Sequence, residues 1–185
     1  MPTKRQEVDV VRIDNKEIDG GIPIYDYFHA EMHKGRHFYY TETVTLASAA
    51  DRELLITTPD SDRQLHFEFS ITGKYITTID FYEGSSLTGG TALTIFNNLR
   101  GSTLVSGATL THTPAGTGDG TKIFTQAFGD GTNPLQAVGG AASQDDEIIL
   151  KKNTKYLLRV TSGTNSNRVN INLKWYEHTI DFGAP

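Results

Sequence analysis

RVNINLKWY, residues 168–176, is the stretch of sequence that decides the fold class. Its apolar residues alternate with polar ones, so a β-strand would place all of them on one face: Val169, Ile171, Leu173 and Trp175. A helix would scatter the same residues around its circumference. The stretch therefore predicts a strand with one buried face.

The same period of two recurs along most of the chain beyond residue 35, where no segment shows a sustained helical stripe. About eight or nine strands, separated by Gly, Pro, Asn and Asp, favour an antiparallel β-sandwich. Strand number and loop length favour a jelly-roll-like sandwich over an immunoglobulin-like one. Besides 168–176, the predicted strands are Phe38–Leu46, Glu53–Thr58, Gln64–Ile71, Tyr75–Tyr82, Ala92–Asn97, Lys122–Phe128, Glu147–Leu150 and Lys155–Val160.

Two stretches rich in Gly, Ser, Thr and Ala, residues 101–121 and 129–146, are predicted to be long loops. Residues 1–35 differ from the rest and are predicted to be an extended N-terminal arm or linker, which leaves residues 36–185 for the sandwich domain. The apolar end of this arm suits docking on a neighbouring subunit. A strand that pairs within its own domain fits the same residues equally well.

Composition excludes several classes of protein. The 185 residues suit one domain, and 37% hydrophobic with 21% charged residues is typical of a soluble globular protein. Cysteine is absent, so neither disulfides nor thiolate metal sites are expected. The net charge of −5 argues against nucleic acid as the main partner. No apolar run is long enough to cross a bilayer, and the N-terminal residues MPTKRQEVDV lack the apolar core of a signal peptide, so no membrane partner is expected.

No catalytic signature is present, so the chain is not predicted to be an enzyme and no cofactor is expected. The sequence lacks a nucleophile elbow, a phosphate-binding P-loop, a dinucleotide fingerprint and an H-E-x-x-H zinc motif. In HAEMHKGRH, residues 29–37, a helix would bring His29, His33 and His37 to one face, where they could share a metal ion. Because Gly35 interrupts that helix, a linker or subunit contact is the favoured interpretation and no metal site is predicted.

Carboxylates cluster in places where a solvated loop is the simpler explanation. A glycosidase needs two carboxylates across a cleft, which sequence neighbours do not establish. Two further aspartates in glycine-rich turns could offer oxygen ligands to Ca²⁺, but the dense acidic spacing of calcium loops is missing. The residues concerned are Asp60, Asp62, Asp145, Asp146 and Glu147 in the clusters, and Asp119 and Asp130 in the turns.

Aromatic residues are candidates for a binding surface. Phe38, Tyr39 and Tyr40 are consecutive, so at least one of their rings faces away from the core. Tyr82 and Tyr176 are predicted to lie on the outward phase of their strands. Such rings suit a sugar platform or an intersubunit surface, and the sequence does not separate the two.

Six pieces of the chain resemble a group of tailed-bacteriophage virion structural proteins, found among head decoration (cement) proteins and related phage proteins. They are HKGRHFYY (33–40), LLITTPDSD (54–62), FYEGSSLTGGTAL (81–93), THTPAGTGDGT (111–121), LKKNTKYLLRVT (150–161) and WYEHT (175–179). The similarity covers most of the chain, but not the first 30 residues, and its motifs are strand and turn sequences rather than catalytic ones.

The resemblance implies a jelly-roll-like sandwich without catalytic residues, which binds the assembled head and stabilises contacts between capsid subunits. The implied partners are the major capsid protein and further copies of the chain, in a homotrimer or alternatively a dimer. The implied location is the capsid surface of a virion assembled in the host cytoplasm. Two other hypotheses remain: a tail- or head-fibre module that binds a host glycan and, least favoured, a glycan hydrolase.

Overall fold

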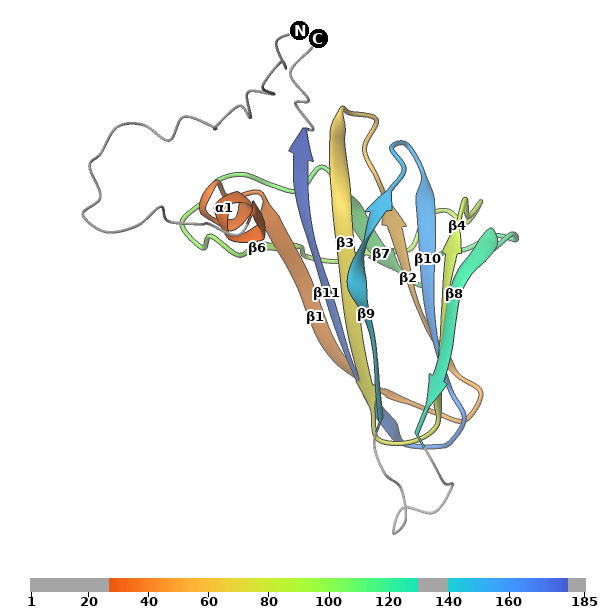
Figure 1. Cartoon of the computed structure of the whole chain (residues 1–185). Coiled ribbons are helices and arrows are strands. Elements are labelled where there is room, and N and C mark those ends of the chain that lie inside the picture. Colours follow the sequence, from red (N-terminus) through yellow and green to blue (C-terminus); the bar gives the residue numbers. More distant parts are fainter. Residues whose placement is uncertain (1–26, 130–139, 180–185) are drawn as a thin grey trace, which may run out of the picture.

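A computed structural model describes residues 27–129 and 140–179, and this part of the chain is nearly all β (Figure 1). The one helix among the described residues is α1 (Tyr27–His33). The strands are β1 (His37–Leu46), β2 (Asp51–Thr57), β3 (Arg63–Gly73), β4 (Thr77–Glu83), β5 (Thr91–Ala92), β6 (Phe96–Asn97), β7 (Thr109–His112), β8 (Thr121–Phe128), β9 (Gly140–Leu150), β10 (Lys155–Ser162) and β11 (Asn167–Thr179).

The strands form two antiparallel sheets that pack face to face, so the β-sandwich predicted from the sequence is confirmed. Sheet A has the order β6-β1-β11-β3-β9, and sheet B has the order β5-β7-β2-β10-β4-β8. Eight described strands remain when the short strands β5, β6 and β7 are left out. Renumbered from first to eighth along the chain, they have the order first-eighth-third-sixth in sheet A and second-seventh-fourth-fifth in sheet B. The first strand of the sandwich therefore lies beside the last.

The core fills the space between the sheets as the alternating pattern predicts. Val169, Ile171, Leu173 and Trp175 on β11 are all 4% exposed or less. They meet inward-facing residues of the neighbouring strands and of sheet B, including Phe67. The strand predicted for residues 168–176 is thus confirmed, and it extends one residue before this stretch and three beyond it.

A layer of aromatic rings crosses the core from one sheet to the other. Phe67 of sheet A stacks on Phe81 of sheet B with ring centroids 5.6 Å apart, and Phe81 stacks on Tyr156 at 5.6 Å. Trp175 lies 6.5 Å from Phe67 and extends the layer along sheet A. Each pair adds about 0.5–1.5 kcal/mol beyond the burial of its area, so this layer fixes how the two sheets face each other.

Three details of the sequence prediction are wrong. The strand predicted for 92–97 is two short strands, β5 and β6, with an irregular segment between them. The loop predicted for 101–121 contains β7, which has a single buried apolar residue, Leu110, and so little alternation to detect. The loop predicted for 129–146 ends at Gly140, where β9 begins to pair with β3. As an edge strand, β9 has a neighbour on one side only, so its sequence need not be apolar.

The predicted N-terminal arm, residues 1–35, lies mostly outside the described residues, which begin at its last part, α1. The extended segment expected within residues 1–26, whether docked on a neighbour or paired within the domain, lies outside the described part. In that part, no helix has the length and apolarity that crossing a membrane requires.

The free edge of sheet A carries an ion pair that reaches across to sheet B. Among the described residues, β6 pairs only with Phe38 and Tyr39 of β1, so the rest of β1 forms the edge of this part of the sheet. Glu42 lies on the inward face of β1, the same face as the core residue Tyr40. Its carboxylate accepts two hydrogen bonds, at 2.7 and 2.6 Å, from the Arg52 guanidinium on β2. The two sheets are therefore joined here by charge rather than by apolar packing.

We predict that Trp175→Ala lowers the free energy of unfolding by about 3–5 kcal/mol, because it removes a buried ring and leaves a cavity. Trp175→Phe is the matched control and should cost less, since it keeps a ring in the aromatic layer. Urea unfolding followed by circular dichroism measures both. A loss below about 1 kcal/mol for the alanine variant would contradict the inward placement of this face of β11.

Candidate interaction surface

Exposed apolar side chains lie at one corner of the sandwich, where α1, β6 and the segment leading to β7 meet. Hydrogen bonds and ion pairs hold the backbone of this corner in place. α1 lies beside β11, and its Glu31, whose side chain is fully buried, ties the helix to the connection that leads into β1. Lys34 Nζ donates to Glu31 Oε1 at 2.6 Å, and Arg36 Nη1 lies 3.7 Å from Oε2. The Arg36 backbone N–H donates to the Glu31 carbonyl oxygen at 3.0 Å. A seven-residue helix is marginal by itself, so these contacts decide where it lies.

Large apolar side chains are exposed at this corner between residues 96 and 105. We name them the 96–105 patch: Phe96, Leu99, Leu104 and Val105, which are 37, 40, 46 and 82% exposed. The Tyr39 ring on β1 lies 5.6 Å from the Phe96 ring and extends the patch onto sheet A. Grouped apolar side chains on a surface are typical of a site where another macromolecule binds.

The segment that carries the patch is anchored by Asn97. The Asn97 side-chain amide donates to the carbonyl oxygens of Gly35 at 2.7 Å and of Leu104 at 3.1 Å. Its Oδ1 accepts from the backbone N–H of Leu99 at 2.8 Å. One side chain thus connects both ends of the patch to the residue that joins α1 and β1.

A second anchor is Glu177 near the end of β11, which is 1% exposed. Its carboxylate accepts hydrogen bonds from the Ser106 hydroxyl at 2.6 Å and from the Gly107 backbone N–H at 3.0 Å. The Trp175 indole N–H also donates to Glu177, at 3.3 Å. Because three donors satisfy this buried carboxylate, the residues just after the patch are fixed to the sandwich body.

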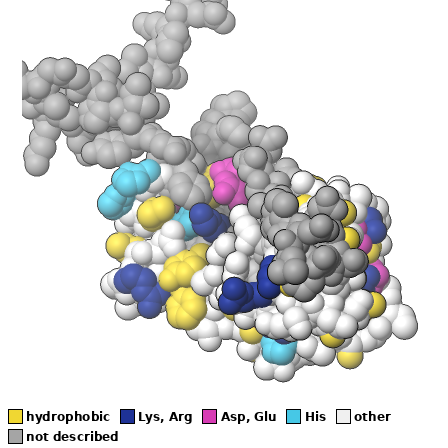
Figure 2. Space-filling view, turned by 90° about the horizontal axis from the view of Figure 1, so that it is seen from below, with side chains coloured by type: hydrophobic (Ala, Val, Ile, Leu, Met, Phe, Trp, Pro, Cys, Tyr) yellow, Lys and Arg dark blue, Asp and Glu magenta, His cyan; other side chains and the backbone are white. Residues whose placement is uncertain are grey.

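The surroundings of the patch are basic. The Arg100 guanidinium lies 5.4 Å from the centre of the Phe96 ring, and Lys34 and Arg36 lie on the neighbouring α1–β1 connection. Figure 2 views the molecule from below. Toward its left, on the side where α1 and β6 lie in Figure 1, hydrophobic side chains gather beside Lys or Arg and His side chains. The corner therefore suits an apolar partner with some negative charge.

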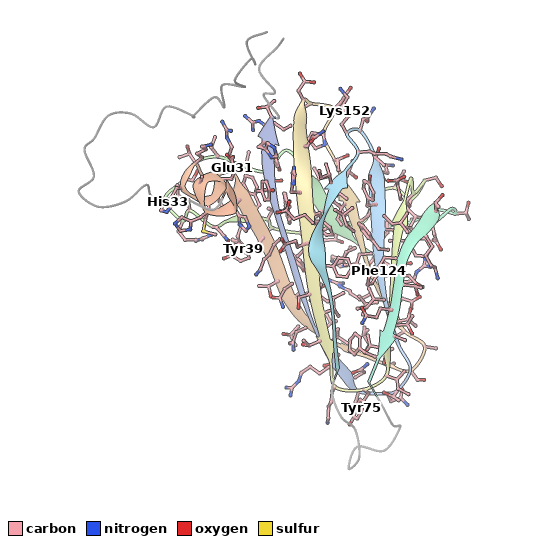
Figure 3. The ribbon with its side chains drawn as sticks, viewed as in Figure 1. Glu31, His33, Tyr39, Tyr75, Phe124 and Lys152 are labelled. Atoms are coloured by element: carbon pink, nitrogen blue, oxygen red, sulfur yellow. The ribbon has the colours of Figure 1, made fainter. Side chains whose placement is uncertain are left out.

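Of the consecutive aromatic residues, Tyr39 is the one whose ring faces away from the core, whereas Phe38 and Tyr40 are buried in it. The prediction that at least one ring faces outward is confirmed. Figure 3 shows Tyr39 below α1, on the outer side of β1. Tyr39 is therefore the aromatic candidate that joins the 96–105 patch.

The outward phase predicted for Tyr176 is correct, but its ring is not available on the surface. Tyr176 does lie on the outer face of sheet A, but it is 5% exposed, because the His66 and His178 rings stack on it at 4.5 and 5.6 Å. Its hydroxyl donates to Glu147 at 2.8 Å. Burial and the neighbouring His66 lower the pKa of His178. Aromatic and polar neighbours cover this ring.

Tyr82 also lies on the predicted face, the outer face of sheet B, and is likewise buried there. Its ring packs with Leu55, Leu87 and Leu157 in a small core of its own. The segment after β4 folds back over the sheet and brings Leu87 into this cluster, which a strand pattern does not reveal. Arg159 adds a cation–π contact, 5.5 Å from the ring centre.

Asp119, considered as a calcium ligand or a turn residue, is a turn residue that binds Arg159. The guanidinium donates to both Asp119 oxygens, at 2.7 and 2.8 Å, and this hydrogen bonding lowers the pKa of the Asp119 carboxyl. The next residue, Gly120, has a φ of +101°, a conformation that glycine adopts without strain. Asp130 lies outside the described residues.

The remaining acidic candidates do not converge in the described part of the chain. Asp60 and Asp62 lie on the β2–β3 connection, and the Asp62 side chain is 89% exposed, 3.7 Å from Lys152. Asp62 lines a shallow, open depression of about 400 Å³ near the end of the sandwich that Lys152 marks in Figure 3. Asp145 and Asp146 belong to β9, but their side chains lie outside the described part.

The three histidines of residues 29–37 are divided between two elements. His29 and His33 lie on α1 with their Nε2 atoms 2.9 Å apart. His37 begins β1 and is 1% exposed, so it does not join them. Among the residues that the structure describes, no group of three or more His, Cys, Asp or Glu side chains could hold a metal ion.

Sequence reasoning missed the 96–105 patch and its two anchors. The stretch FNNLRGSTLV has apolar residues at irregular spacing among Gly, Asn and Ser, which resembles neither a strand nor a helix. Its one available signal was that Leu99, Leu104 and Val105 lie in a segment predicted to be mostly loop. Asn97 and Glu177 gave no signal, since a polar side chain that anchors a segment cannot be told from a solvated one without its partners.

Comparisons with protein families, with curated proteins and with solved structures found no match for this chain. A function must therefore be supported by the surface described above and by the sequence resemblance.

The pH dependence of stability follows from His37. Burial, and then the charge of Lys174, lower the pKa of this imidazole to about 4. The unfolded chain takes up the proton near pH 6.5 and the folded protein near pH 4, so stability is complete above about 6.5 and is lost as the pH falls between the two values. The lost stability amounts to about 3 kcal/mol.

We predict that His37→Gln reduces this pH dependence, as measured by urea unfolding at pH 7 and at pH 4.5. His178 contributes in the same direction in both proteins, so their difference isolates His37. Equal losses of stability in the variant and in the unchanged protein would show that His37 is not held neutral by the fold.

Proposed function

We propose that this protein is a structural component of a tailed-bacteriophage particle, a decoration protein that binds the assembled head through the major capsid protein. The observation that carries the proposal is the 96–105 patch, an apolar surface on an anchored segment at one corner of the sandwich. Its character is that of a protein-binding surface rather than of a pocket for a small molecule. The sequence resemblance to phage head decoration proteins indicates that the assembly it binds is a virus head.

The pieces of sequence that carry the resemblance include two that are packed together. Residues 81–93 and 111–121 approach each other over the outer face of sheet B, where Thr88 and Ala115 form a β-bridge. Ser86 and Gly118 are joined by a backbone hydrogen bond of 2.9 Å. Segments that are distant in the sequence but similar to the same family thus share a place in the fold, which supports one common architecture.

We propose further that this architecture is a jelly roll. Along the described chain, each long strand lies in the other sheet from the one before it, except that β8 pairs with β4 in sheet B, and the resulting orders are first-eighth-third-sixth and second-seventh-fourth-fifth. Two interleaved Greek keys produce this order.

As a decoration protein, the chain acts by mass action. It binds the assembled shell and not the separated subunits, so it disfavours their separation. A homotrimer, or alternatively a dimer, would bind several identical capsid sites at once and add avidity to weak single contacts. The place of action is the capsid surface of a virion that assembles in the host cytoplasm, and no reaction is part of the mechanism.

The test is co-sedimentation of the purified protein with undecorated capsids of its phage. Leu104→Ser together with Val105→Ser should weaken binding about tenfold or more, because both side chains leave water when the patch is covered. Ile149→Ser is the matched control. This residue is 52% exposed and lies on β9, at the opposite edge of sheet A from β6. Equal binding by the patch variant and the control would overturn the role of the patch.

Deletion of residues 1–20 tests the arm separately. The core strands begin at His37, so we expect the shortened protein to keep its melting temperature. Its assembly with capsids or with its own copies should be weaker. Light scattering and co-sedimentation measure assembly. A large loss of thermal stability would instead show that the arm pairs within its own domain.

The alternative function is a fibre module that binds a host glycan. Tyr39 and Phe96 favour it, since their rings lie 5.6 Å apart at a tilt of 31° and are both on the surface. A glycan array separates the two functions. Tight binding to a defined sugar, together with no binding to capsids, would replace the decoration proposal with this one.

A further inference from the structure

α1 presents two imidazoles on the face opposite its buried anchor. His29 and His33 are exposed and one turn apart, whereas Glu31 lies on the other side of the helix and is fully buried. Figure 3 shows His33 on the side of α1 away from the sheets and Glu31 on the side toward them. The two histidines are therefore open to solvent on a helix whose position is fixed.

The two imidazoles are arranged as a pair of metal ligands would be. Their Nε2 atoms are 2.9 Å apart, and the rings meet edge to face with centroids 4.5 Å apart. With metal–nitrogen bonds of about 2.0–2.1 Å, this separation corresponds to an N–metal–N angle of about 90°. A tetrahedral angle would require about 3.3 Å between the nitrogens. The observed spacing fits neighbouring positions of a square-planar or octahedral ion better than it fits zinc.

We propose that His29 and His33 form a two-ligand site for Cu²⁺ or Ni²⁺. Both ions accept imidazole in square-planar or tetragonal geometry, and Cu²⁺ binds most tightly of the first-row divalent ions. Water fills the remaining positions, because no third His, Cys, Asp or Glu among the described residues lies close enough. His37 is not a ligand, since it is buried at the start of β1.

Metal binding at this pair needs a change of tautomer and a rotation of the exposed rings that turns both Nε2 lone pairs toward one ion. In the hydrogen bond between the two Nε2 atoms, one imidazole carries its proton on Nε2 and the other accepts it. When the metal takes both Nε2 lone pairs, the donating imidazole moves that proton to Nδ1 through solvent. The proton count of this hydrogen-bonded pair is unchanged, because the proton only moves from Nε2 to Nδ1 of the same ring.

Nearby cations do not occupy the site. Lys34 follows His33 directly, but its ammonium lies 2.6 Å from Glu31 Oε1 on the other face of the helix. Arg100 is placed over the Phe96 ring. Because these charges are held elsewhere, they leave the imidazole face of α1 open to a cation.

A bound metal would link two successive turns of a helix that has only seven residues. A short helix gains from such a link, since the cost of ordering its first turn is then shared with metal binding. The metal therefore stabilises the connection between residues 1–26 and the sandwich. The site does not depend on the proposed role in a phage particle.

The test is isothermal titration of the full chain with CuCl₂ and, separately, with NiCl₂. We expect one ion per chain, and affinity lower by about a hundredfold in His29→Ala and in His33→Ala, because the second ligand binds intramolecularly. His112→Gln is the matched control, which removes an imidazole of β7 that bonds to Arg52 and should leave the affinity unchanged. Thermal melts of each variant without metal establish that it is folded.

Two further measurements identify the ligands. Electron paramagnetic resonance of the Cu²⁺ complex should show two equatorial imidazole nitrogens in the unchanged protein and one in each single variant. Hydrogen exchange should slow over residues 29–35 when Ni²⁺ is added, and not in the double variant His29→Ala/His33→Ala. Unchanged affinity in that double variant, or the same nitrogen signal in all proteins, would overturn the proposal.

Discussion

The stacking of aromatic rings between the sheets is the constraint on which the rest of the structure depends. Phe67 and Phe81 come from different sheets and lie nearly parallel, with an interplanar angle of 18°. Rings of this size cannot slide past one another without opening voids, so their contact sets both the spacing and the register of the sandwich. Tyr156 continues the stack, and its hydroxyl is satisfied by Glu83 and by the backbone N–H of Lys151. Burial raises the pKa of this phenol to about 12, so it remains a neutral donor.

The corner that holds the 96–105 patch is connected to this core through β11. Trp175 belongs to the aromatic layer, and two residues later on the same face of β11 is Glu177, which anchors Ser106 and Gly107. A segment without regular secondary structure is thereby tied to a strand of the hydrophobic core. Its apolar side chains can be exposed at a defined place without being free to collapse onto the body. A binding surface of this kind loses little conformational entropy when it is covered.

The fold could be predicted from the sequence because several of its long strands alternate apolar and polar residues over many positions. Residues 168–176 and 64–71 are the clearest examples, and each is confirmed within a few residues. β7 was missed because four residues with one buried side chain carry almost no pattern. The start of β9 was missed because its residues are small or charged, as an edge position allows.

The outer faces of the sheets were harder to predict, for a different reason. The alternation of a strand gives the face on which a residue lies, but not whether another segment covers that face. Tyr82 and Tyr176 were placed on the correct faces and yet are buried, by the segment carrying Leu87 and by two histidine rings. The histidine pair of α1 was visible from its spacing of four, whereas the separation of His37 depended on where the helix ends.

The ion pair between Glu42 and Arg52 has a consequence for crowded surroundings. An exposed strand edge is a template on which further strands can add without limit, and β1 offers such an edge beyond β6. An approaching strand that displaced Arg52 would leave the Glu42 carboxylate desolvated without its cation, which costs several kcal/mol. The charge between the sheets therefore disfavours the addition of further strands at this edge.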